Sequence, residues 1–492
     1  MLEFVGFAIL VLIFWIWQKS RPSRFPPGPL CLPIVGNGHN LSLNHLFFGQ
    51  MEKLHSKYGP LISLSVAGDQ IWDVWFRDYE IAKEVWNDPR FSSRSIVPLA
   101  AKLELERGVS FTSGADSRSK RTMLFKVFKA LGVFDKSVFS VGVEKEVELM
   151  MNYLDTMTEK NLFIQEVMSF VTNNSISKLL FNFSLDDNFD SHRSSKRNKD
   201  LMKLFELFNP TKKHWYLPFV ISRHLFETKQ LIRLRGELFH FIVENYNKRV
   251  TKMKSERGEP ECVSDILWEK FDYFRKSASE KPFLEEDIPY ILWELYLAGQ
   301  ESTIITLTWA VLNMIHFPDV QEKVYQELKR MFPSRDQIIS LNEAMSCDYL
   351  MATIHESQRF TPTSYTTIDH MANETVENFH GYRIPKGTRM MSHNALNYKN
   401  GNYFKYPLEF NPRNFLNDSE KYARNEHLTS FATGLRACPG QHIARTELFL
   451  VLANLLRRFK ICPAEFVPPL EAKIGITTIP PYFQAKLVQR AN

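Results

Sequence analysis

Apolar residues at helical spacing dominate the chain, and the longest such segment is also the most apolar. Residues 287–316 read DIPYILWELYLAGQESTIITLTWAVLNMIH. They predict one interior helix of about 45 Å, because they are apolar on nearly every face. Pro318 and Asp319 begin a second, amphipathic helix expected over 318–331. A third helix, rich in leucine and phenylalanine, is predicted over 440–459.

Two shorter stretches have the pattern of β-hairpins. Residues 60–76 contain two strand-like runs around 67–69, and residues 379–393 contain two more around 385–387. No internal repeat or low-complexity tract interrupts the remainder of the chain. We therefore predict a mainly α fold with a minor β region, and one domain over 38–492.

The first residues predict a membrane anchor and a hinge. Residues 4–17 carry no charge, and Lys19, Arg21 and Arg24 follow directly. A helix over this stretch and the residues before it measures about 25 Å, the short end for a membrane span. The basic flank places everything after residue 18 in the cytosol. A cleaved signal peptide is the alternative, but it needs a basic start and small residues at the cut.

We therefore favour an uncleaved anchor over 1–24. Four prolines in 25–37 predict a stiff hinge after it. In a cytosolic domain the N-x-Ser/Thr patterns carry no sugar, and these begin at Asn40, Asn173, Asn182, Asn373 and Asn417.

The net charge limits the kinds of binding partner, and the cysteine content indicates the redox compartment. The 492 residues carry a net charge of +6, without a basic run dense enough for nucleic acid. Such a charge better suits binding to a membrane surface or to an acidic protein. The five cysteines are few and scattered, which argues against a disulfide framework and for a reducing compartment.

One cysteine lies in an unusually constrained loop, FATGLRACPG at 431–440. Gly434 allows a turn with positive φ, Gly440 leaves room for a close approach, and a helix follows Cys438. The helix N-terminus favours the thiolate form, and Arg436 adds positive charge. A structural cysteine is the plain alternative, and zinc binding with His442 lacks further clustered ligands. The loop therefore predicts a metal-bound thiolate.

Two polar patterns occur on predicted helices. Glu301, Ser302 and Thr303 interrupt the long apolar helix. Their hydroxyls could simply bond to carbonyls one turn earlier, or these polar groups could have a functional role in the protein interior. Glu356 and Arg359 stand three residues apart and therefore face the same side, where they can pair.

The pattern Phe431-x-x-Gly434-x-Arg436-x-Cys438-x-Gly440 resembles the haem-binding loop of the cytochrome P450 monooxygenases. The resemblance extends over most of the chain from about residue 25. It implies the fold of that family, and haem b as cofactor with Cys438 as the thiolate ligand of iron. The anchor, the hinge and the AGQEST motif are similar to the animal microsomal branch.

The resemblance also assigns roles to the helical patterns. Glu301, Ser302 and Thr303 correspond to the oxygen-activation motif, where the family has threonine in place of Ser302. Serine lacks the methyl group that fixes the rotamer, so we expect more leakage to peroxide.

By resemblance, Glu356 and Arg359 correspond to a buried structural ion pair of the family, which usually includes a third, basic residue. Asn414 stands in that third position here. It can form a hydrogen bond but carries no charge, so we expect its effect to be on stability.

For the haem propionates, the resemblance points to Arg94, Arg121, His370 and Arg436. The family often has tryptophan four residues before the position of Arg121, where this chain has Ser117. A basic stretch made of Arg118, Lys120, Lys126 and Lys129 would meet an acidic electron donor. That donor is expected to be NADPH–cytochrome reductase, with cytochrome b5 as an additional candidate.

Together these features predict a haem-thiolate monooxygenase of the endoplasmic reticulum membrane, acting on an apolar xenobiotic, fatty acid or steroid. By resemblance, the substrate contacts come from 96–112, 202–240, Leu297, Ala298, Ser302, 362–368 and 474–478. The alternatives are an isomerase or dehydratase of lipid peroxides, which usually lacks the acid–alcohol pair, and a non-catalytic haem carrier or sensor.

Overall fold

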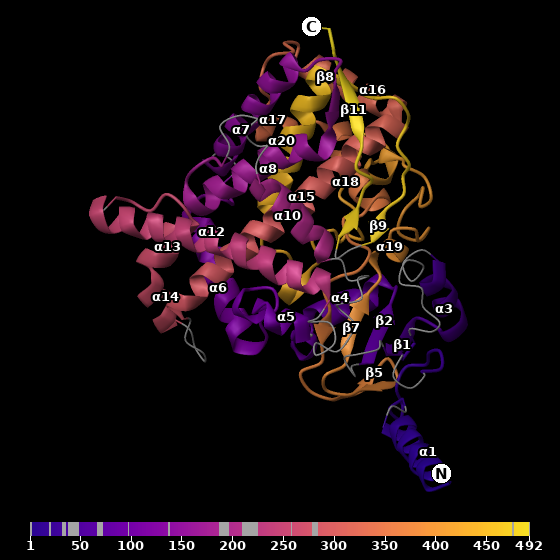
Figure 1. The fold of residues 1–492 in the computed structure, drawn as a ribbon. Coiled ribbons are helices and arrows are strands. Elements are labelled where there is room, and N and C mark those ends of the chain that lie inside the picture. The colour runs from indigo at the N-terminus through magenta and orange to yellow at the C-terminus, as the bar shows by residue number, and fades with distance from the viewer. Residues whose placement is uncertain are drawn as a thin grey trace.

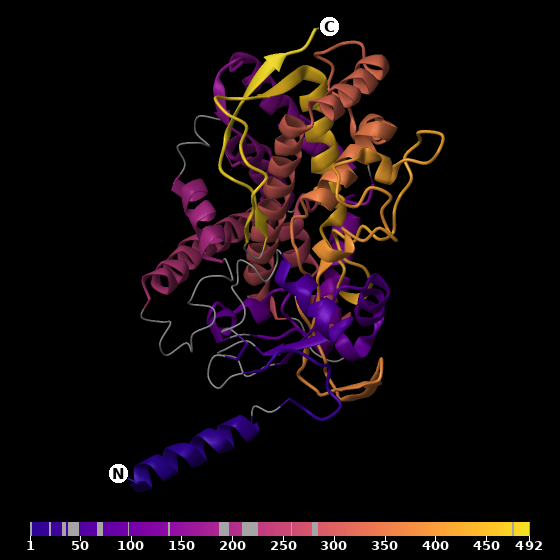
Figure 2. The same cartoon turned by 90° about the vertical axis from the view of Figure 1, so that its right-hand side faces the viewer.

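The chain is mainly helical, with several small sheets, as the sequence predicts (Figure 1). The computed structural model describes residues 2–18, 21–31, 36–37, 49–65, 72–96, 98–135, 138–185, 196–208, 225–256, 258–277, 284–474 and 477–491. The four-stranded sheet lies at the end of the molecule nearest the N-terminus, and the sheet containing β11 lies at the opposite end (Figures 1 and 2).

The long apolar segment forms one helix, α15 (Ile288–His316), which confirms the prediction. It packs against α8 (Ile164–Phe181), α12 (Phe226–Glu256), α18 (Asp348–Phe360) and α20 (Gln441–Arg458). Because neighbours surround it, apolar residues are needed on nearly all of its faces. The few polar residues on α15 therefore face protein rather than bulk water.

The other two predicted helices are also confirmed, as α16 (Pro318–Met331) and α20. The remaining described helices are α1 (Leu2–Gln18), α3 (Met51–Tyr58), α4 (Tyr79–Asn87), α5 (Pro98–Lys102), α6 (Gly114–Ala130), α7 (Val138–Thr156), α10 (Lys196–Leu207), α13 (Val263–Glu269), α14 (Phe271–Ser277), α17 (Leu341–Met345) and α19 (Asn394–Asn397). Among the described residues, no helix combines the length and the apolar character needed to cross a membrane.

The first predicted hairpin is confirmed. Strands β1 (Leu61–Ser65) and β2 (Trp72–Phe76) pair antiparallel, and the sheet order is β1-β2-β7-β4, with β4 at His370–Met371. Hinge residues are fastened to this sheet, since the Ser63 hydroxyl donates to the Pro26 carbonyl at 2.7 Å. The chain therefore enters the domain along β1.

The second predicted hairpin is wrong. Strand β6 (Tyr382–Ile384) pairs with β5 (Val376–Phe379), whereas β7 (Arg389–Ser392) runs parallel to β2 in the other sheet. The turn at His380 and Gly381, both at positive φ, closes the actual hairpin. Alternation marks strands but does not choose their partners, and a partner 316 residues away, such as Asp73 for Arg389, leaves no local pattern.

Two further sheets have the strand orders β3-β11-β8 and β10-β9. Their strands are β3 (Asn161–Phe163), β8 (Phe459–Pro463), β9 (Lys473–Ile474), β10 (Thr478–Ile479) and β11 (Gln484–Gln489). The indole N–H of Trp309 on α15 donates to the Thr478 carbonyl at 2.6 Å. This bond ties the interior helix to the C-terminal strands.

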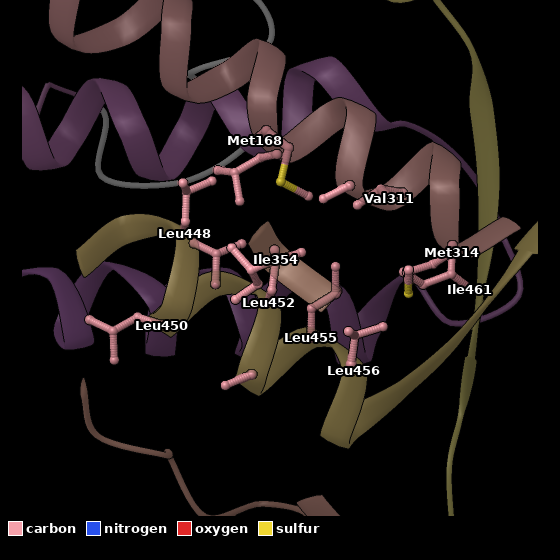
Figure 3. Packing of buried hydrophobic residues seen from close by; sticks show 14 of the residues in the cluster. Met168, Val311, Met314, Ile354, Leu448, Leu450, Leu452, Leu455, Leu456 and Ile461 are labelled. Carbon is pink, nitrogen blue, oxygen red and sulfur yellow. The ribbon is translucent and has the colours of Figure 1, made fainter. Parts of the chain in front are cut away.

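The largest hydrophobic cluster lies where α15, α18 and α20 meet α8 (Figure 3). Leu452 and Leu455 of α20 point toward Ile354 of α18, and Val311 of α15 approaches from above in this view. These residues are buried. The cluster fixes α20, the helix that follows the Cys438 loop, against the helix that carries Glu301.

Replacement of Leu455 by alanine should lower the free energy of unfolding by about 2–5 kcal/mol, because it opens a cavity in this cluster. The midpoint of urea unfolding measures the loss. Leu149→Ala on α7 is the control, since Leu149 is exposed. Equal midpoints for the two variants would mean that the cluster does not stabilise α20.

Candidate active site

The Cys438 loop lies between a short 3-10 helix at Gly434–Arg436 and the start of α20. The Cys438 N–H donates to the Phe431 carbonyl at 2.9 Å, which closes the loop on itself. The Arg445 guanidinium lies 5.0 Å from the centre of the Phe431 ring. The structure thus places Cys438 directly before a helix, as the sequence predicts.

Gly434 has the positive φ that the sequence predicts, at +75°. A Cβ atom there would lie 2.2 Å from the Trp86 carbonyl oxygen, which belongs to α4. Gly440 differs, since a Cβ atom there would lie 4.0 Å from the Cys438 sulfur, an ordinary contact. Gly434 is therefore required by the fold, whereas the protein itself does not crowd Gly440.

Burial raises the pKa of the Cys438 thiol. The Gly440 N–H and the guanidinium groups of Arg121 and Arg445 act in the opposite direction, but burial is the larger effect. This corrects the expectation that the following helix is enough to keep the sulfur ionised. A bound cation reverses this balance, because coordination deprotonates a thiol.

Three guanidinium groups gather beside this loop. Arg436 donates to the carbonyls of Thr112 at 2.9 Å and Ser110 at 2.5 Å, and to the Ser117 hydroxyl. Arg94 donates to the same Ser110 carbonyl at 3.2 Å. Arg121 donates to the Ala437 carbonyl at 2.6 Å, next to Cys438.

Burial lowers the pKa of all three arginines, and repulsion from neighbouring guanidinium groups lowers it further for Arg436, to about 9, and for Arg94, to about 10. The acids that offset the repulsion are Glu294 and Asp369. Buried cations at this density favour an additional anion. The donor set, a thiol beside clustered guanidiniums, therefore fits a metal cofactor that carries carboxylates.

His370 joins the same region but contributes no charge. Its Nδ1 lies 3.0 Å from the Phe91 carbonyl oxygen. Burial and the nearby Arg94 and Arg436 lower the pKa of the imidazole to about 3, so the ring is neutral at pH 7. A neutral ring bonded to a carbonyl carries its proton on Nδ1, and Nε2 is then an acceptor.

The sequence analysis missed Glu294 of α15. Its carboxylate accepts from the backbone N–H groups of Val109 at 2.5 Å and Ser110 at 2.8 Å. It thereby fixes the turn whose Ser110 carbonyl accepts from Arg94 and Arg436. A lone acid in an apolar helix was the sequence pattern that could have revealed it.

The predicted oxygen-activation residues lie on α15 but do not hydrogen-bond to one another among the bonds that the described residues make. The Ser302 hydroxyl donates to the Ala298 carbonyl at 2.9 Å, one turn earlier. The Glu301 carboxyl accepts from the Thr477 hydroxyl at 2.7 Å. Burial raises the pKa of Glu301 to about 7, although the Thr477 bond opposes the rise.

Thr303 faces a second acid that the sequence analysis missed. Glu447 of α20 is buried with Thr303 and Ser175 near its carboxyl, although neither hydroxyl makes a hydrogen bond to it among the bonds of the described residues. Burial raises the pKa of Glu447 well above its usual range. Glu301 and Thr303 therefore contact different neighbours of α15.

Glu356 and Arg359 form a buried, bidentate ion pair, with nitrogen–oxygen distances of 2.6 and 2.7 Å. Arg359 also donates to the Tyr398 carbonyl at 2.8 Å. The Asn414 amide lies 3.2 Å from both Glu356 oxygens and donates to them. Asn414 thus supplies hydrogen bonds at this position without adding a charge.

The basic stretch on α6 is only partly a surface. Arg118, Lys126 and Lys129 are exposed, but Lys120 is buried and lies 3.3 Å from Asp116 and 3.4 Å from Asp287. The inclusion of Lys120 in a solvent-facing patch is therefore wrong. Helical spacing did not reveal its partner Asp287, which is far away in sequence.

Several predicted substrate-contact segments meet beside α15. The Thr306 hydroxyl lies 2.5 Å from that of Thr363, and the Thr478 N–H donates to the Thr363 carbonyl at 2.7 Å. Ala298 is exposed although the neighbouring Leu297 is buried. Some predicted positions lie outside the described residues, namely 32–35 of the hinge, Asn40 of the N-x-Ser/Thr patterns expected to carry no sugar, the turn 67–69 of the first hairpin, and 97, 209–224 and 475–476 of the contact segments.

The fold and these residues define a helical protein of the haem-thiolate class, and comparison with known proteins agrees. The family model described as Cytochrome P450 matches residues 26–487. The chain belongs to the cytochrome P450 family and is an oxidoreductase of the monooxygenase class.

Similar proteins include cytochrome P450 2E1 of Mesocricetus auratus, 27% identical over 98% of this chain and 97% of the relative. Cytochrome P450 2E1 of Bos taurus is 28% identical, with the same two coverages. Cytochrome P450 2C38 of Mus musculus is 25% identical over 98% of this chain and 99% of its own. The resemblance to the animal microsomal branch is thereby confirmed.

Gly434→Ala should destabilise the protein more than Gly381→Ala. Both glycines have positive φ, at +75° and +86°, but only at Gly434 does a Cβ atom collide with backbone. The extra loss thus isolates the collision with Trp86 from backbone strain. Urea unfolding midpoints give the comparison, and equal losses would show that the α4 contact does not constrain the loop.

Proposed function

We propose that this protein is a membrane-anchored haem-thiolate monooxygenase that inserts one atom of O2 into an apolar substrate. Its cofactor is haem b, which supplies the iron chemistry that activates O2 once bound. Cys438 would provide the thiolate that binds the iron. The observation that supports this most strongly is the thiol beside the cluster of Arg94, Arg121 and Arg436.

Each loop residue has a distinct part in holding the haem. Cys438 would coordinate the iron, and the arginines and His370 would receive the propionates, which would relieve the repulsion between the guanidinium groups. Phe431 and Gly434 shape the loop, and Gly440 keeps space open beside the sulfur. With a propionate nearby, the pKa of the His370 imidazole would rise and Nε2 could donate a hydrogen bond.

Proton delivery is the task of the acid–alcohol residues on α15. With a pKa of about 7, Glu301 can both accept and release a proton near neutral pH. The Ser302 hydroxyl can leave the Ala298 carbonyl by rotating about χ1, because serine lacks a second substituent on Cβ. Thr303 lies near Glu447, a buried carboxyl of α20 whose pKa burial raises.

Electrons come from a separate protein, and the exposed basic side chains of α6 supply the contact. Arg118, Lys126 and Lys129 are exposed there, as is Phe125. Such a surface attracts an acidic partner and adds an apolar contact. NADPH–cytochrome reductase is the proposed donor, with cytochrome b5 as a second, and the microsomal relatives support a reductase partner.

The proposed location is the endoplasmic reticulum membrane, with residues 1–24 as anchor, 25–37 as hinge and the catalytic domain in the cytosol. The apolar stretch with its basic flank supports this, as do the relatives. The substrate is an apolar xenobiotic, fatty acid or steroid that lies beside Leu297, Ala298 and Ser302.

Reductase-coupled turnover tests the proposal against its two alternatives. A monooxygenase consumes NADPH and O2 together and forms a product that contains one added oxygen atom, which mass spectrometry detects in ¹⁸O2. An isomerase converts lipid peroxides without NADPH. A carrier shows neither reaction, so inactivity with both reductase and peroxides would contradict the proposal.

Ser302→Ala should raise the peroxide released per NADPH several-fold, because the variant loses a hydroxyl that helps to deliver protons. Ser302→Thr should lower it, since the added methyl group restricts the rotamer. Ser346→Ala, at an exposed serine on the surface, is the control. Unchanged coupling in Ser302→Ala would assign the relay to Thr303 or to water.

A further inference from the structure

The Glu301 carboxyl is held by a residue from a distant part of the chain. Thr477 lies 176 positions later, is buried, and donates its hydroxyl to Glu301 Oε1 at 2.7 Å. This is the hydrogen bond that the described residues give to that carboxyl, and none comes from Ser302 or Thr303. The acid is therefore oriented from outside its own helix.

The backbone next to Thr477 is fixed. The Thr478 N–H donates to the Thr363 carbonyl at 2.7 Å, and the Thr478 carbonyl accepts from the Trp309 indole at 2.6 Å. Trp309 is two turns along α15 from Glu301. Since α15 and the C-terminal segment are joined there, the Thr477 hydroxyl is held in register with the carboxyl.

We propose that Thr477 is the positioning residue for Glu301, which aims its carboxyl and sets its proton occupancy. The proposal rests on the proposed function, in which Glu301 handles protons. Because segment 477–478 is also expected to contact the substrate, it couples substrate binding to proton delivery. Thr477 acts through Glu301 and needs no contact with the reacting atoms.

The electrostatics favour this assignment. A hydroxyl that donates to a carboxylate stabilises the charged form, while burial stabilises the neutral form. For Glu301 these are the two effects that move the pKa, and burial is the larger. Loss of the Thr477 hydroxyl therefore raises the pKa above about 7 and leaves the acid protonated and undirected at neutral pH.

Among the described residues no charged group contributes to the pKa shift of Glu301, and several acids and bases on the elements around α15 are engaged elsewhere. Glu294 on α15 itself binds the 109–110 backbone, and Glu447 on α20 faces Thr303 and Ser175. On α8, Glu166 accepts a hydrogen bond from Tyr482, and Lys178 pairs with Glu146. On α12, Arg249 pairs with Asp265. On α18, Glu356 pairs with Arg359. Thr477 is thus the group whose removal should change Glu301.

The direct test follows the carboxyl C=O stretch of Glu301 by infrared difference spectroscopy as pH is varied, in the full-length protein. Glu301→Gln identifies the band. In Thr477→Val the titration midpoint should rise by about one to two pH units, the effect of a lost hydrogen bond to a charged group. Thr477→Ser keeps the hydroxyl and should titrate like the parent.

Thr308→Val is the matched control, because Thr308 is a buried threonine of α15 whose hydroxyl bonds to the Ile304 carbonyl. Its midpoint should not move. If Thr477→Val does not fold, Thr477→Ala takes its place in the comparison. A midpoint in the hydroxyl-free variant equal to those of the parent and Thr308→Val overturns the proposal.

Turnover with reductase gives a second measurement. In Thr477→Val, product formed per NADPH should fall several-fold at pH 7, with coupling restored in Thr477→Ser. A shifted infrared midpoint in a protein that never oxidises a substrate would contradict the proposed function but support the role of Thr477. Normal oxidation of a substrate with an unshifted infrared midpoint would support the proposed function but contradict the role of Thr477.

Discussion

Buried positive charge beside Cys438 is the constraint on which the rest of the site depends. Burial lowers the pKa of Arg94, Arg121 and Arg436, repulsion from neighbouring guanidinium groups adds to this for Arg94 and Arg436, and backbone carbonyls hold each of the three in place. The cost of keeping these charges together is offset in part by Glu294 and Asp369. Arg121 and Arg445 favour a thiolate at Cys438, although burial works against it. A metal cofactor that carries negative charge offsets the repulsion between the arginines, and its metal ion stabilises the thiolate.

Helix α15 connects this charge to the rest of the molecule. Its two carboxyl groups bind different neighbours, Glu294 the 109–110 turn and Glu301 the C-terminal segment, while Thr303 lies near the acid Glu447 of α20. Because the helix is buried, each polar group needs a partner within the protein. Apolar packing of α15 against α20 therefore also fixes where the acids stand relative to the Cys438 loop (Figure 3).

Local pattern was enough to predict the elements that depend on local chemistry. The run of apolar residues predicted α15, Pro318 marked the start of α16, and glycine at 434 predicted a positive φ. Features decided by distant partners were missed or wrong. Lys120 is buried because Asp287 meets it, β7 joins β2 rather than β6, and Thr477 reaches Glu301 across the fold. Periodicity carries no information on such pairings, since it describes which face is buried but not what covers it.

The central claim is that Cys438 is the axial ligand of a haem. The reduced, carbon monoxide-bound absorption spectrum tests it most directly, because a thiolate ligand shifts the Soret band strongly to the red. The account predicts that band for the parent protein and for Cys462→Ser, and its loss in Cys438→His. Persistence of the red-shifted band in Cys438→His would contradict the account.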